Sequence, residues 1–181
     1  MAHQPNRIGS QAVGAYGEKV VEAELLRRGW VSSNVNASIK NAADFDIFAV
    51  KNRRAVYLRV KTCGPDMNAF QFGFRPNQKI LDADIDSADF TILVSMGTAR
   101  QDDQFYVLPT RTVRETIDTY KQAYLKQTKR DGGNRKDTGH WTLHLPDLRS
   151  NEDRPNYGWA RKWSTYRDKW ESLEGVGHTT L

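Results

Sequence analysis

Cysteine is almost absent from this chain, which has only Cys63 among its 181 residues. A single thiol cannot form a disulfide within the chain, so the core alone must hold the fold, and such cysteine usage is typical of a reducing compartment. No apolar run is long enough to cross a membrane, and the amino terminus lacks the apolar region of a signal peptide. We therefore expect a cytoplasmic protein with no membrane partner.

Glycine-rich phosphate loops and Cys-X-X-Cys pairs are also missing, which removes the nucleotide-binding and zinc-binding classes that depend on them. The length suits one domain. We expect a disordered segment at residues 1–9, a single domain over residues 10–175 and a flexible tail at residues 176–181.

Positive charge is what the chain has in excess. Its formal net charge is +5 and its pI is about 9.3, with the lysine and arginine excess concentrated between residues 121 and 170. Such a bias fits nucleic-acid binding. A flexible basic loop at residues 126–136 is either solvated or in contact with phosphates; its candidate nucleic-acid-binding residues are Lys126, Lys129, Arg130, Arg135 and Lys136.

Hydrophobic periodicity predicts a mixed α/β chain. The expected helices are 11–28, 110–127 and 157–173, and the expected strands are 30–37, 44–50, 55–62, 70–74, 90–96, 104–108 and 141–145. Phe70, Phe72 and Phe74 alternate along one strand, so they should share a face that packs into the core. Four aromatic residues at helical spacing in 157–173 predict a helix that docks the C-terminal part onto the sheet.

The strand at 55–62 carries two cations on one face. Side chains alternate across a strand, so Arg59 and Lys61 stand opposite the face formed by Val56, Leu58 and Val60. If this strand pairs with the preceding strand 44–50 as a hairpin, Asp46 and Lys61 can meet.

The first helix carries a carboxylate inside its apolar stripe. At about 100° per residue, Glu18 lies with Gly14, Val21 and Leu25, and Glu22 lies at the edge of the stripe. A carboxylate on a buried face is costly unless it is paired or bound to a cation. A salt bridge at the rim of the core and a cation site both satisfy this requirement.

These segments together resemble a known family. Gly14-Ala-Tyr-Gly-Glu18, Asp44-Phe-Asp46-Ile47 and Leu58-Arg-Val-Lys61-Thr62 are similar to the motifs of the PD-(D/E)XK, or restriction-endonuclease-like, nucleases. The similarity covers residues 11–62 and is strongest to the small prokaryotic branch whose third strand reads Gln/Glu-Val-Lys-Thr. It implies a restriction-endonuclease-like core, in which helices flank a central mixed, twisted sheet. The expected order is helix, strand, strand, strand, then further strands and a C-terminal helix.

The resemblance also implies a chemistry: hydrolysis of DNA phosphodiesters with Mg²⁺ or Mn²⁺, with RNA left open as a substrate and a homodimer permitted. Asp46 would bind the metal directly, Glu18 directly or through water, and the Val60 backbone carbonyl would add a ligand. Lys61 would orient or help deprotonate the attacking water and stabilise developing negative charge.

Arg59 stands where the family has Glu or Gln, and a guanidinium has no acceptor atom with which to bind a metal. Three explanations compete. Glu22 or Asp44 supplies the missing ligand; Arg59 pairs with Asp46 or Glu18, so that the cluster only supports the fold; or Arg59 contacts a DNA phosphate. The leading hypothesis is a nuclease, and the alternative is a non-catalytic module that binds nucleic acid or a protein partner on the nuclease fold. A purely structural interaction protein is a third interpretation.

Overall fold

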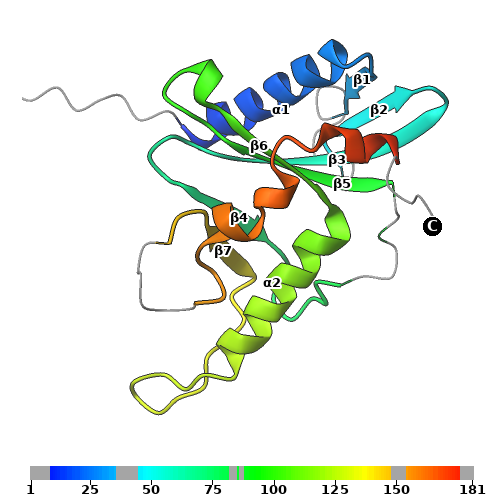
Figure 1. The fold of residues 1–181 in the computed structure, drawn as a ribbon. Coiled ribbons are helices and arrows are strands. Elements are labelled where there is room, and N and C mark those ends of the chain that lie inside the picture. Colours follow the sequence, from blue (N-terminus) through cyan, green and yellow to red (C-terminus); the bar gives the residue numbers. More distant parts are fainter. Residues whose placement is uncertain (1–8, 36–44, 82–84, 86–87, 148–153, 176–181) are drawn as a thin grey trace, which may run out of the picture.

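The computed structural model describes residues 9–35, 45–81, 85, 88–147 and 154–175. Within these ranges, seven strands form two sheets (Figure 1). The central sheet has the order β1-β2-β3-β5-β6, with β1 (Val31–Asn34), β2 (Ile47–Lys51), β3 (Arg54–Cys63), β5 (Asp89–Ser95) and β6 (Gln104–Pro109). The smaller sheet pairs β4 (Ala69–Gly73) with β7 (His140–His144).

The helices are α1 (Ser10–Arg27), α2 (Thr110–Leu125) and the short α3 (Trp159–Lys162). Single 3₁₀ turns occupy Arg100–Asp102, Ser164–Tyr166 and Trp170–Glu174. No helix in the described ranges combines the length and apolar character that a membrane span requires.

The central sheet is mixed: β3 and β5 are parallel, and the pairs β1–β2, β2–β3 and β5–β6 are antiparallel. The predicted hairpin is present: β2 and β3 lie side by side with Ile47 opposite Leu58, and the turn between them places Asn52 and Arg53 at positive φ. The predicted order of helix, strand, strand, strand and the mixed sheet flanked by helices are therefore confirmed.

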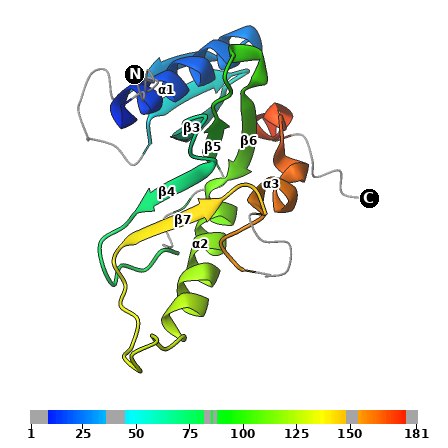
Figure 2. The same cartoon turned by 90° about the vertical axis from the view of Figure 1, so that its left-hand side faces the viewer.

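Each face of the central sheet carries its own core. On one face α1 packs Val20, Val21 and Leu25 against buried residues of β2, β3, β5 and β6. On the other face, Val113 and Ile117 of α2 join the small sheet, whose Phe70 and Phe72 are buried as predicted from their alternation. In Figure 2 α1 lies at one end of the molecule, and α2 extends away from it behind β4 and β7.

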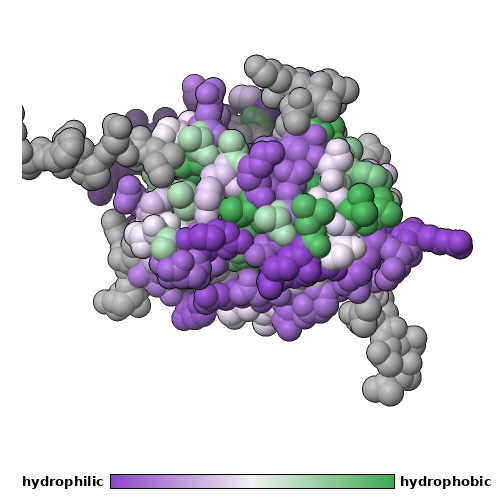
Figure 3. Space-filling model, turned by 90° about the horizontal axis from the view of Figure 1, so that it is seen from above, coloured by the Kyte–Doolittle hydropathy of each residue, from purple (hydrophilic) through white to green (hydrophobic). Residues whose placement is uncertain are grey.

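The outer surface near α1 is mostly hydrophilic. Figure 3 views the molecule from this side and shows apolar side chains only in small groups among polar ones. Leu26 and Val31 are among the few large apolar side chains of the described chain that are strongly exposed, at 61% and 75%. Scattered exposure of this kind is ordinary for a protein surface.

Contact between α1 and β3 is close because Gly17 has no side chain. A Cβ built on Gly17 would lie 1.7 Å from Thr62 Oγ1, far inside any allowed contact. A second tether holds the same helix, since the Tyr16 hydroxyl donates to Asp103 Oδ2 at 2.5 Å. Burial and this carboxylate raise the pKa of Tyr16 to about 12. Both contacts fix the position of Glu18, which follows directly in the chain.

The prediction of a continuous helix over 157–173 is wrong. The segment forms α3 and two separate 3₁₀ turns, with Asp168 at positive φ. Its backbone leaves the helical path and pairs with β6. Arg167 forms an isolated antiparallel β-bridge with Tyr106, and the Asp168 N–H donates to the Phe105 carbonyl at 2.9 Å. The predicted docking role is nevertheless present, because Trp163 and Trp170 are both buried in the core.

Candidate active site

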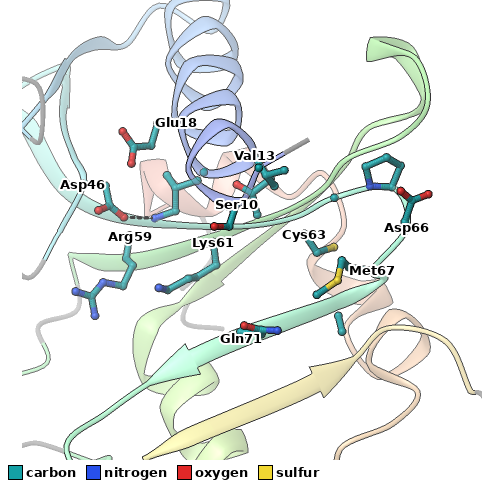
Figure 4. Close-up of a pocket in the computed structure, with 17 residues that line it drawn as sticks. Ser10, Val13, Glu18, Asp46, Arg59, Lys61, Cys63, Asp66, Met67 and Gln71 are labelled. Atoms are coloured by element: carbon teal, nitrogen blue, oxygen red, sulfur yellow. Dashed lines mark hydrogen bonds between the residues drawn. The ribbon is translucent and has the colours of Figure 1, made fainter. Parts of the chain in front are cut away.

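A cleft of about 900 Å³ opens between the start of α1, the middle of β3 and the small sheet. Glu18, Asp46, Arg59 and Lys61 all line it, together with Gln71 of β4 (Figure 4). The structure therefore brings together four of the residues that the sequence predicted as a site, two carboxylates and two cations. Its remaining wall, from Cys63 to Met67, is the turn that joins β3 to β4.

Asp46 is held at the point where the β2–β3 hairpin opens. Its backbone N–H donates to the Leu58 carbonyl at 2.8 Å, which continues the ladder by one bond. Farther along β3, the Val60 N–H also points toward β2. It donates a hydrogen bond to the side chain of Asp46, with 2.7 Å between the nitrogen and Oδ2 (Figure 4). The carboxylate thus replaces a strand partner and cannot swing away without leaving that N–H unbonded.

The Val60 carbonyl lies at the same edge as this N–H. In a strand, the backbone N–H and C=O of one residue point to the same side. The Val60 N–H points toward β2, so its C=O does as well. Regular pairing with β2 ends at Ile47 and Leu58, so this carbonyl lies beyond it. The position suits the role of an added oxygen ligand next to Asp46.

Glu18 projects from α1 toward β1. Its Oε2 accepts a hydrogen bond from Asn34 Nδ2 at 2.7 Å. Sequence reasoning missed Asn34, because the contact joins residues on different elements that only the fold brings together. The only available signal was a polar residue ending a short strand next to the proposed site.

Lys61 is half-buried in the cleft, and its ammonium interacts electrostatically with both Arg59 and Asp46. Burial lowers the pKa of Lys61, Arg59 lowers it further by repulsion, and Asp46 acts in the opposite direction. A half-buried ammonium beside a carboxylate is suited to binding a negatively charged group that enters the cleft.

Arg59 stands on the same side of β3 as Lys61. Among the described residues it makes no ion pair with Glu18 or Asp46, and in Figure 4 its guanidinium points away from Glu18. The explanation in which Arg59 pairs with either carboxylate therefore does not match the structure. The two explanations that remain are a substitute ligand and a contact with a DNA phosphate.

One candidate substitute ligand, Glu22, lies outside the cleft. Glu22 contacts Lys19 at 3.5 Å and does not line the cleft, while Asp44 lies outside the described residues. Within the described part of the chain, no cluster of three or more His, Cys, Asp or Glu side chains could hold a metal ion. Glu18, Asp46 and the Val60 carbonyl provide two carboxylates and one carbonyl, a set that fits Mg²⁺, since this ion keeps several waters and needs only one or two carboxylates.

The basic loop does not reach this cleft. It follows α2 at the end of the helix farthest from α1 (Figure 1). Hydrogen bonds within the loop give it a defined turn, including Lys129 N–H to the Gly133 carbonyl at 2.8 Å and a bridge between Thr128 and Asn134. Lys126, Lys129, Arg130 and Lys136 are exposed there, and Arg135 is half-buried.

No protein-family model matches the chain, and no curated protein sequence matches it. Among solved structures it is similar to the bacterial homing endonuclease I-Ssp6803I, at 14% identity over 94% of this chain and 95% of the other, with a TM-score of 0.48. It is also similar to MepB, at 11% identity over 84% and 95%, with a TM-score of 0.36. Both TM-scores lie below 0.5, so the function proposed below rests on the site.

Proposed function

We propose that this protein is a divalent-metal-dependent nuclease that hydrolyses phosphodiester bonds in DNA. The observation that carries the proposal is the joint placement of Glu18, Asp46 and Lys61 in one cleft, with Asp46 fixed by the Val60 N–H. Two carboxylates from different elements and a half-buried lysine have little reason to converge at a strand edge for packing alone, because burying charge is costly. The PD-(D/E)XK resemblance assigns chemistry to the same three residues.

Each group has a distinct role in the proposal. Asp46 and Glu18, with the Val60 carbonyl, would hold Mg²⁺ or Mn²⁺, and the ion would supply Lewis-acid stabilisation of charge on the scissile phosphate. Asn34 holds the orientation of Glu18. Lys61 binds a phosphate oxygen or the attacking water and stabilises negative charge as it develops. Arg59 adds a second cation on the same face and contacts a neighbouring phosphate.

A second candidate function has its own support in Arg59. A fixed cation lines the cleft where related motifs carry an acceptor side chain, and this opposes binding of a divalent ion. The cleft would then bind the phosphate backbone without cutting it, as a non-catalytic nucleic-acid-binding module.

Cleavage assays decide between the two candidates. Purified protein is incubated with duplex, single-stranded and branched DNA, and with RNA, in Mg²⁺, Mn²⁺ or EDTA. Asp46→Ala and Lys61→Met are compared with Glu115→Gln and Lys79→Met, which change exposed residues outside the cleft. The nuclease proposal expects metal-dependent cleavage that falls by about 10²-fold or more in the first pair and is unchanged in the second.

Two results would count against catalysis. One is the absence of cleavage by the wild type in either metal, combined with salt-sensitive DNA binding that weakens in Lys61→Met; this outcome supports the binding module. The other is cleavage that persists in Asp46→Ala and Lys61→Met, which would place any activity outside this cleft.

A further inference from the structure

A second pocket, of about 510 Å³, lies between the C-terminal half of α2 and residues 154–157. Its walls combine tyrosines with guanidinium groups, and its principal residues are Tyr120, Tyr124, Arg135, Arg154, Asn156 and Tyr157. Residues 154–157, which come after β7 in the chain, lie alongside α2 (Figure 2). None of these residues lines the cleft that holds Asp46.

Arg135 is held in place without a counter-charge. Its guanidinium carbon lies 4.5 Å from the centre of the Tyr124 ring, and its Nε is buried without a hydrogen-bond partner. Among the described residues it forms no ion pair. A rigid, stacked and unneutralised guanidinium suits a bidentate contact to a phosphate.

Other charged and phenolic residues of the pocket are close enough to Tyr120 to influence its hydroxyl. Burial raises the pKa of Tyr120; Tyr124 and Tyr157 act in the same direction, and Arg135 and Arg154 oppose them. The hydroxyl of Tyr120 is therefore within electrostatic reach of two other phenols and two guanidiniums. Such a group of side chains can bind an anion and a polar ring at the same time.

Tyr157 offers a stacking face. His144 packs against it with ring centroids 4.6 Å apart and planes at 12°, yet His144 does not line the pocket. The imidazole thus covers one face of the ring from outside the pocket, and Tyr157 itself lines the pocket. A nucleobase stacks on such a face only when it is unpaired and unstacked from its neighbours.

The surroundings favour a polyanion over a small anion. Gln127 and Arg135 line the pocket and lie near the two ends of the basic loop. The exposed lysines and arginine of this loop extend the positively charged surface away from the pocket. α2 also links the pocket to the candidate active site, because Arg114 lines a small cavity together with Arg59 and Lys61. From Arg114 to Tyr124 the helix rises about 15 Å, at 1.5 Å per residue.

We propose that this pocket binds one unpaired nucleotide of a nucleic-acid strand, with the phosphate on Arg135 and the base on Tyr157. As a statement about substrate it rests on the proposed nuclease function. It then predicts a substrate with a single-stranded part beside the scissile phosphate. Binding itself needs neither metal nor catalysis.

Fluorescence anisotropy in EDTA tests the pocket separately from cleavage. The probes are a short labelled oligothymidine and a blunt duplex of equal length. The variants are Tyr157→Ala, Arg135→Gln and Arg135→Lys, with Arg27→Gln as the matched control, because Arg27 is an exposed arginine of α1 with 70% of its side chain accessible. Circular dichroism and thermal melting establish that each variant is folded.

We expect Tyr157→Ala and Arg135→Gln each to weaken oligothymidine binding by about 10-fold, with little change for the duplex. Arg135→Lys should be intermediate, because it keeps the charge and loses the planar stack, and Arg27→Gln should bind like the wild type. Folded Tyr157→Ala and Arg135→Gln proteins that bind oligothymidine as tightly as the wild type would overturn the proposal. An equal loss for duplex and single strand in both variants would also overturn it.

The two proposals fail in different ways. Pocket-dependent binding with no cleavage by any metal-loaded protein removes only the nuclease function. Cleavage that depends on Asp46 and Lys61, with oligothymidine binding untouched by both pocket variants, removes only the nucleotide pocket.

Discussion

Asn34 Nδ2 donates a hydrogen bond of 2.7 Å to Glu18 Oε2, and this bond joins the edge strand β1 to the carboxylate of α1. One oxygen of Glu18 is thereby oriented by an amide, which leaves the side chain less free to rotate. Partners of this type behind a metal ligand influence affinity strongly, although they do not touch the metal.

Asn34→Ala should therefore weaken Mn²⁺ binding to the cleft by about 10-fold, within the range known for groups that orient ligands. Calorimetric titration of Mn²⁺ measures this. Ser33→Ala is the control, since Ser33 is the neighbouring residue on β1 and is exposed. Equal affinity in Asn34→Ala and wild type would show that the hydrogen bond does not position a ligand.

Replacement of Arg59 should strengthen metal binding. Arg59→Gln removes a cation from the cleft and restores an acceptor, so Mn²⁺ affinity should rise by about 10-fold, corresponding to about 1.4 kcal/mol of relieved repulsion and added ligation. Arg59→Lys keeps the positive charge and should bind Mn²⁺ like the wild type. If Arg59→Gln instead leaves metal affinity unchanged and weakens DNA binding, the residue acts only on the phosphate backbone.

Gly17 and Gly14 form a matched pair on α1. Gly17→Ala places a methyl group against Thr62 and should destabilise the protein by about 1–3 kcal/mol as α1 moves off β3. A Cβ on Gly14 meets nothing within 4 Å, so Gly14→Ala should stabilise the fold by about 0.5–1 kcal/mol through helix propensity. Urea denaturation measures both, and two changes of the same sign would contradict the predicted close contact.

A buried ion pair beside the basic loop predicts acid sensitivity. Lys121 Nζ lies 2.6 Å from Asp137 Oδ2, and both side chains are almost fully buried. Burial alone would raise the pKa of Asp137, but hydrogen bonds from Lys121 and from the backbone N–H groups of Gly139 and Asn77 outweigh it and hold the pKa below 3.8. The folded carboxyl therefore ionises at lower pH than the unfolded one.

The resulting stabilisation is fully present above the unfolded pKa of 3.8 and is lost as pH falls through the lowered folded value. Asp137→Asn should remove this pH dependence and also destabilise the protein at neutral pH by about 3–5 kcal/mol, because Lys121 is left buried without its counter-charge. The double variant Lys121→Met/Asp137→Asn should recover most of that loss. Denaturation at several pH values measures each outcome, and an Asp137→Asn variant as stable as wild type at neutral pH would contradict it.

The sequence by itself determined most of the elements and which of their faces are buried. Alternating apolar residues placed Val56, Leu58 and Val60 on the buried face of β3, and the helical period placed Val21 and Leu25 on the buried face of α1. Local periodicity suffices for such assignments, because each element must bury one face. It did not suffice for residues 157–173, where pairing with the edge of β6 replaces helical hydrogen bonds.

Tertiary structure alone decided which charged groups share a space. The sequence offered Glu18, Glu22, Asp44 and Asp46 as candidate acids, yet only the packing of α1 on β3 places Glu18 and Asp46 in the cleft and leaves Glu22 outside it. The bond of Asn34 to Glu18 and the tyrosine and arginine pocket beside α2 could not be recognised from the local sequence. Their contacts join segments far apart in the chain, and the distance between such groups depends on how the layers pack, which no periodicity within a single element records.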